Sequence, residues 1–204
     1  LIGCTLSGSL YFAAATSAAG WELWRATGTS ATLVEDINPG VASGIRMPFT
    51  FTSLDTRVLF IAFYGAQAGR LWTTSGTSAD TNVVATLTPQ VDWLATVPFH
   101  IVAGRAAFAG DDSVSGVEPW VSDGTTVGTY LLGNLNPREA GSFPGELTSV
   151  GTQLFFSAAD DRTTSDLWMS DGTELGTVAV GAGVADPEQL WPYQLTELAG
   201  TLYF

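Results

Sequence analysis

The stretch Asp166–Thr177, with the sequence DLWMSDGTELGT, decides the fold of this chain. Variants of it return every 48 residues, so that columns of identical residues run through all 204 positions. The columns are Trp24, Trp72, Trp120 and Trp168; Gly28, Gly76, Gly124 and Gly172, each followed by Thr; and Phe12, Phe60, Phe108, Phe156 and Phe204. Three columns that stay in register over the whole chain indicate a repeat architecture.

Each repeat predicts four short β-strands. The last full repeat has runs rich in apolar, β-branched or aromatic residues, separated by Gly, Asp and Thr, at 147–150, 154–158, 166–170 and 178–180. Such runs are typical of strands joined by tight turns, and no stretch shows helical periodicity with caps. Four antiparallel strands in about 40 to 50 residues is the size of one propeller blade.

We therefore predict an all-β fold: a β-propeller of four-stranded antiparallel blades, forming a single domain or part of a larger propeller. The repeats lie at approximately 1–48, 49–96, 97–144 and 145–192, with a partial repeat at 193–204.

The Trp and Gly columns are interpreted as structural. In the turn Ser170–Thr173, Asp171 can accept a backbone N–H and Gly172 can take a positive φ. The Trp is large enough to fill the space between twisted neighbouring blades. Stacking on a ligand is the alternative role for this column.

Three segments closely resemble the bacterial ELWxxDGTxxGT repeat: Glu22–Trp24, Glu118–Thr129 and Asp166–Thr177. The resemblance covers essentially the whole chain. It implies a propeller in a secreted or surface bacterial protein, often a large multidomain one, and it implies no defined catalytic residue.

The first two repeats depart from this pattern. Thr27 and Ser75 stand in place of the Asp, and Asp80 replaces the second Gly. We expect these departures to lower the stability of the turns and not to remove an active site.

Composition and charge limit the partners. The chain has seven Arg, no Lys and twenty acidic residues, for a net charge of −13, which disfavours nucleic acid and anionic membrane surfaces. Cations or neutral glycans suit this charge better. Charged residues make up only 13%, which fits export, and no apolar run approaches a membrane-spanning length, so we predict no direct membrane insertion. We expect a secreted or cell-surface location.

Cys4 is the single cysteine and is interpreted as a small buried hydrophobe, with a reactive or intermolecular thiol as the alternative.

The two ends of the chain match each other. Leu1–Phe12 aligns with Tyr193–Phe204 at a distance of four periods, so the chain holds one hairpin more than a closed four-bladed ring can place. We expect the chain to be part of a longer array or assembly with more blades. The alternative is a structural subunit whose spare hairpin completes a blade in a neighbouring molecule.

Ligand-binding candidates come from the loops that differ between repeats. Trp21, Tyr64 and Trp93 lie in such loops and have no aromatic equivalent in the other copies. An exposed aromatic ring suits stacking on sugars or anchoring a protein partner, whereas a ring that merely covers a loop is the alternative. By contrast Met47, Phe143 and Trp191 form an apolar column before Pro and are assigned to packing.

Paired acids in the same loops make calcium a possible cofactor. Asp111, Asp112, Asp160 and Asp161 are the candidate ligands. The loop after Asp111 partly resembles the oxygen spacing of a calcium loop, but Ser122 stands where the bidentate acid is expected. Turn capping and solvation are the alternative role.

The sequence gives little support for an enzymatic function. The single His, His100, lies between apolar residues in a predicted strand, and neither a phosphate-binding Gly-rich loop nor a His/Cys metal cluster is present. A glycan-processing hydrolase with paired acids is the remaining enzymatic alternative. The sequence favours a non-enzymatic extracellular binding or display module for a glycan or protein ligand.

Overall fold

The structure is a computed structural model that describes residues 3–47, 50–65, 69–89, 99–138, 140–160, 165–180 and 192–204. Within these ranges the chain is all-β, with one short 3₁₀ turn, η1 (Ser78–Asp80), and no α-helix. The predicted all-β class with four-stranded antiparallel sheets is therefore confirmed.

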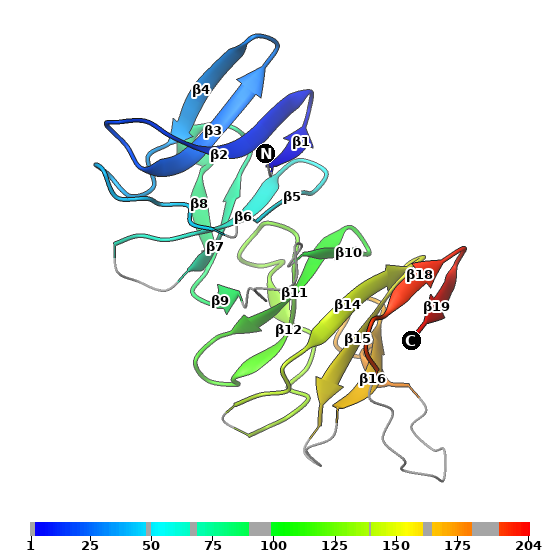
Figure 1. Cartoon of the computed structure of the whole chain (residues 1–204). Helices are drawn as coiled ribbons and strands as arrows, with labels where there is room; N and C mark the ends of the chain where they lie inside the picture. The colour runs from blue at the N-terminus through cyan, green and yellow to red at the C-terminus, as the bar shows by residue number, and fades with distance from the viewer. Residues whose placement is uncertain are drawn as a thin grey trace. The chain divides into compact units, whose positions relative to one another are not determined.

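The four main strands of each sheet follow one another in chain order (Figure 1). Sheet 1 holds β1 (Gly3–Leu6), β2 (Ser9–Ala15), β3 (Trp21–Thr27) and β4 (Ser30–Glu35). Sheet 2 holds β5 (Phe51–Ser53), β6 (Val58–Ala62), β7 (Arg70–Thr74) and β8 (Asn82–Ala85). Sheet 3 includes β10 (His100–Val102), β11 (Arg105–Asp111), β12 (Val117–Ser122) and β13 (Tyr130–Leu131), preceded in the chain by β9 (Thr88–Pro89). Sheet 4 holds β14 (Gly145–Val150), β15 (Gln153–Ala159), β16 (Ser165–Ser170) and β17 (Val178–Ala179), and β18 (Thr196–Leu198) with β19 (Thr201–Tyr203) forms a last hairpin.

The chain divides into two compact units. The first comprises residues 1–98 and 123–129, and the second comprises residues 99–122 and 130–204. Sheets 1 and 2 belong to the first unit, whereas sheets 3 and 4 and the last hairpin belong to the second.

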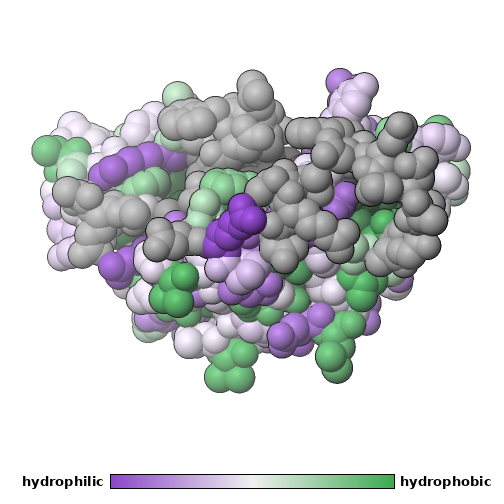
Figure 2. Space-filling model, turned by 90° about the horizontal axis from the view of Figure 1, so that it is seen from below, coloured by the Kyte–Doolittle hydropathy of each residue, from purple (hydrophilic) through white to green (hydrophobic). Residues whose placement is uncertain are grey.

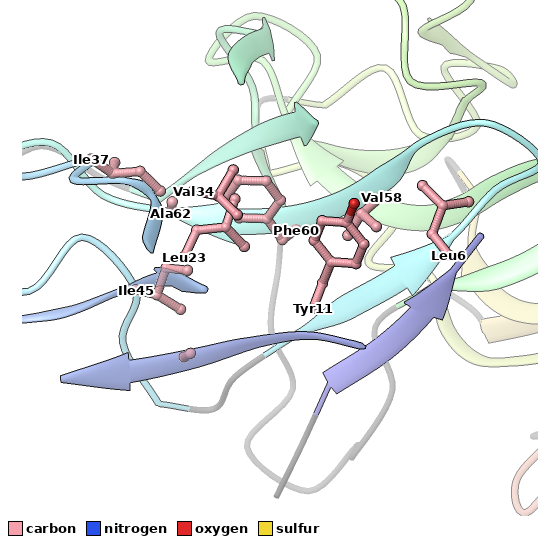
Figure 3. Packing of buried hydrophobic residues seen from close by; sticks show 10 residues of the cluster. Leu6, Tyr11, Leu23, Val34, Ile37, Ile45, Val58, Phe60 and Ala62 are labelled. Carbon is pink, nitrogen blue, oxygen red and sulfur yellow. The ribbon is translucent and has the colours of Figure 1, made fainter. Parts of the chain in front are cut away.

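The core of the first unit joins one face of sheet 1 to one face of sheet 2 (Figure 3). Because side chains alternate along a strand, β6 presents every second residue to sheet 1. Phe60 is fully buried there, and its ring stacks on Phe51 and Trp72 at centroid distances of 5.9 and 6.4 Å. The cluster contains Leu6, Tyr11, Ala13, Leu23, Val34, Ile37, Ile45, Val58, Phe60 and Ala62.

The second unit builds its core in the same way. Phe156 of β15 takes the place that Phe60 has in β6, and it is again fully buried. The cluster contains Val102, Ala107, Val121 and Leu132 from sheet 3 and its following loop, with Leu154, Phe156 and Ala158 from β15.

A Phe opposite a Trp recurs in all four sheets. The register pairs Phe12 with Trp24, Phe60 with Trp72, Phe108 with Trp120 and Phe156 with Trp168. The four indoles are half-buried, and those of Trp72 and Trp168 pack against the two cores. Phe60 and Phe156 thus lie in the two cores, with Trp72 and Trp168 packed against them.

The turns after β12 and β16 are closed by one shared set of hydrogen bonds. An oxygen of Asp123 accepts from the backbone N–H and the hydroxyl of Thr125, at 2.8 and 2.7 Å. The Thr125 hydroxyl in turn accepts from Gly128 N at 2.9 Å, while the Thr129 hydroxyl donates to the Thr125 carbonyl. The same bonds recur around Asp171, among Thr173, Gly176 and Thr177. Four of the five fixed letters of the DGTxxGT motif, all but its first Gly, therefore have a place in this network.

The second Gly of the motif makes room for the carboxylate. A Cβ built at Gly128 would lie 2.0 Å from a carboxylate oxygen of Asp123. In sheet 2 the two positions hold Ser75 and Asp80, and Asp80 accepts a hydrogen bond from the Thr77 hydroxyl at 2.7 Å. Hydrogen bonds from Thr77 and Ser75 lower the pKa of Asp80. The departure in the second repeat therefore moves the carboxylate to the other side of the turn instead of removing it.

The turn glycines also allow close approach to the preceding sheet. Arg25 donates to the Gly76 carbonyl at 3.1 Å, and a Cβ at Gly76 would lie 2.4 Å from the Tyr11 hydroxyl. Tyr130 donates to the Gly172 carbonyl at 2.8 Å in the second unit. Gly28 also has a positive φ, but a Cβ there would meet nothing within 4 Å.

We expect Gly28→Ala to cost about 1 kcal/mol, from backbone strain alone. Gly76→Ala should cost about 2 kcal/mol more, because its Cβ meets the buried Tyr11. Urea unfolding of the two variants measures the difference. Equal losses in the two variants would show that the turn around Gly76 does not pack against Tyr11.

The carboxylate exchange is tested by a double-mutant cycle. We expect Gly128→Asp to lower the free energy of unfolding by about 3 kcal/mol, because two carboxylates then compete for one space. Adding Asp123→Ser should recover at least about 1 kcal/mol, since it copies the Ser75 and Asp80 arrangement. Additive losses in the double variant would show that the two positions do not share this space.

Candidate functional site

The loop after β4 is held by a buried carboxylate. Glu22, the second residue of β3, is fully buried. One of its oxygens accepts from Ile37 N at 2.9 Å and the other from Gly44 N at 2.6 Å. Burial raises the pKa of Glu22, and these backbone N–H groups partly offset that rise. Glu22 therefore folds the loop 36–47 back over the start of β3.

Glu118 does the same in sheet 3. It is fully buried and accepts from Leu135 N at 3.2 Å, Asn136 N at 3.1 Å and the Ser142 hydroxyl at 2.5 Å. Burial raises the pKa of this carboxyl too, against the effect of its donors. Sequence reasoning missed this role; its signal was an acid placed directly before the apolar residues of a strand.

The folded-back loop lies beside Trp21. The backbone N–H of Trp21 donates to the Ser43 hydroxyl at 3.1 Å, and Ile45 N donates to the Trp21 carbonyl at 2.8 Å. Arg46 and Met47, the next residues, are thereby brought next to the indole. Together they line a hollow of about 350 Å³, bounded by Trp21, Ser43, Ile45, Arg46 and Met47. Ile45 is fully buried, whereas 44% of Trp21 is exposed.

Arg46 is fixed from the side of sheet 2. Its guanidinium carbon lies 4.6 Å from the centroid of the Phe63 ring, and it donates to the Gly65 carbonyl at 2.9 Å. Phe63 N donates to the Gly44 carbonyl at 2.7 Å, which ties this segment to the loop of sheet 1. Tyr64 lies between the two Arg46 contacts and is 56% exposed.

Two of the three predicted ligand residues are thus linked through one cation. Trp21 lines the hollow with Arg46, and Tyr64 lies on the segment that holds Arg46 in place. Trp93 lies outside the described residues. Arg46 was missed by sequence reasoning, although it also breaks the period: its equivalents are Leu94, Ser142 and Leu190.

The packing assigned to the column before Pro is wrong for two of its members. Met47 is 75% exposed and Phe143 is 61% exposed. In the view of Figure 2, exposed hydrophobic residues stand as separate spots between hydrophilic ones. Trp191 lies outside the described residues.

The acids proposed for calcium cap their own loop where they are described. Asp111 accepts from Ser113 N at 2.7 Å, and Asp112 accepts from Val114 N and Ser115 N at 2.9 and 2.7 Å. Asp160 is half-buried, and Asp161 lies outside the described residues. Across the described part of the chain, no three His, Cys, Asp or Glu side chains gather into a metal-binding group. Calcium binding remains a prediction.

Cys4 and His100 lie in strands. Cys4 is half-buried against the core of the first unit, and burial raises the pKa of its thiol to about 12. A thiol with that pKa stays protonated near neutral pH and is a weak nucleophile. His100 is the first residue of β10 and pairs with Ala107.

Comparisons of this chain with family models, curated proteins and solved structures found no match. The resemblance to the ELWxxDGT repeat therefore remains a prediction. None of the described residues forms a helix that is both long and apolar enough to span a membrane.

The anchoring role of Glu118 is tested by its removal. Glu118→Ala should lower the free energy of unfolding by about 3 kcal/mol, because three donors lose their acceptor in or near the core. The exposed Glu174 is the matched control, for which Ala should change stability by less than about 0.5 kcal/mol. Similar small losses in both variants, measured by urea unfolding, would refute the anchor.

Proposed function

We propose that the chain forms a β-propeller, or part of a larger one, in which the four-stranded sheets are the blades. The Phe and Trp pairs shared by the four sheets support this proposal, as does the turn network shared by the last two full repeats. The module belongs to a secreted or cell-surface bacterial protein, as the resemblance to the ELWxxDGT repeat implies. The hydroxyl-rich, weakly charged composition agrees with that location.

The proposed activity is non-enzymatic binding of a glycan in the hollow beside Trp21. The observation that carries it is an indole that is 44% exposed next to a guanidinium held by two contacts. Neither side chain has a counterpart in the other three repeats, so the sheets themselves do not require them. A flat aromatic face with polar groups beside it is well suited to stacking on a sugar ring.

The buried carboxylates support binding over hydrolysis. A hydrolase with paired acids needs one acid to protonate the leaving group and another carboxylate to attack or to activate water. Glu22 and Glu118 instead accept hydrogen bonds from the loops that they anchor. Both carboxylates therefore serve to hold loops in place.

Binding is tested with Trp21→Ala on a glycan array. We expect signals to fall by at least about tenfold while the free energy of unfolding changes by less than about 1 kcal/mol, because the indole is partly exposed. Trp72→Ala is the matched control: it should cost about 3 kcal/mol, because that indole packs on Phe60.

Three outcomes would contradict the proposal. Unchanged glycan binding by a folded Trp21→Ala protein would exclude the hollow as the site. A loss of several kcal/mol in Trp21→Ala would make this residue part of the core. Absence of array binding together with capture of a purified protein partner would replace the glycan by a protein.

A further inference from the structure

We propose that the hollow beside Trp21 selects a sugar that carries a carboxylate over its neutral counterpart. This inference rests on the proposed function and adds the chemical class of the ligand. The residues that carry it are Trp21, Ser43 and Arg46, with Phe63 and Gly65 behind Arg46.

The polar side chains of the hollow offer donors. Arg46 has five N–H donors and no acceptor, and it uses one donor for the Gly65 carbonyl. The Ser43 hydroxyl already accepts from the backbone N–H of Trp21, which leaves its own O–H to donate. A sugar hydroxyl both donates and accepts, whereas a carboxylate only accepts, so this lining favours the carboxylate.

Arg46 is prepared for such a partner before binding. Its contacts with the Phe63 ring and the Gly65 carbonyl fix the plane of the guanidinium. A fixed guanidinium loses less side-chain freedom on binding, and its fork matches the two oxygens of a carboxylate. The exposed indole nearby supplies the apolar face on which the sugar ring can stack.

The net charge of −13 limits the ligand to a short one. On composition alone, neutral glycans suit the chain better, because a long polyanion is repelled by the summed charge. That repulsion is screened beyond about 8 Å at physiological ionic strength, whereas a direct contact with Arg46 is screened much less. The hollow volume of about 350 Å³ also fits a short ligand.

The test compares trigalacturonic acid with its methyl ester by isothermal titration calorimetry at physiological ionic strength. The two sugars differ in charge at the carboxyl groups and keep the same rings. We expect the acid to bind at least about tenfold more tightly, as a charge-assisted pair implies. Arg46→Gln should remove this preference, and Arg46→Lys should restore only part of it.

Arg138→Gln is the matched charge control. It removes the same charge from an exposed residue that does not line the hollow, and it should leave the preference for the acid unchanged. Thermal unfolding of each variant shows whether the protein is folded.

The outcomes separate this inference from the proposed function. Equal binding of acid and ester, both lost in Trp21→Ala, would overturn the carboxylate preference and leave glycan binding standing. A preference that survives in folded Arg46→Gln protein would also overturn it. Binding of neither sugar, or binding of a tri-aspartate peptide in their place, overturns the inference, and the glycan array then decides the function.

Discussion

A buried carboxylate must be hydrogen-bonded, and this constraint places the candidate site. Moving an ionised carboxyl out of water without hydrogen-bond partners costs more free energy than the stability of a small domain can offset. Glu22 meets the requirement with backbone N–H groups of the loop that follows β4, which brings Ser43, Ile45 and Arg46 alongside Trp21. The hollow is thus a consequence of how one acid is satisfied inside sheet 1.

The same chemistry explains much of the acidic composition. Asp112, Asp123 and Asp171 accept backbone N–H groups of their own loops, as Glu22 and Glu118 do in the interior. These acids order the chain where it leaves a strand, where backbone donors have no partner strand. A net charge of −13 therefore reflects, in part, a use of carboxylates as loop acceptors.

The sequence predicted the sheets well because their determinants are local and repeated. Alternating apolar runs, Gly turns and the columns of Phe and Trp predict the four-stranded antiparallel sheets that the structure shows. The loops were predicted less well. Met47 and Phe143 look like core residues in a list of apolar positions, but they are exposed because an acid distant in sequence determines the path of each loop. Arg46 was overlooked because its value as a ligand group depends on Phe63 and Gly65, which lie in the loop after β6 of sheet 2.

The turn after β12 groups with the first unit, although its flanking strands belong to the second. The hydroxyl of Thr126 in that turn donates to the Val84 carbonyl at 3.0 Å, and a Cβ at Gly124 would meet Arg57. A sheet together with its own turn is therefore not a complete piece of this molecule. The piece with a full set of neighbours is a sheet plus the turn of the sheet that follows it. A fragment or a graft that contains whole sheets with their own turns would lack the contact partners of one turn and the turn that packs on one sheet. The better place to divide the chain is therefore between a turn and the strand that follows it.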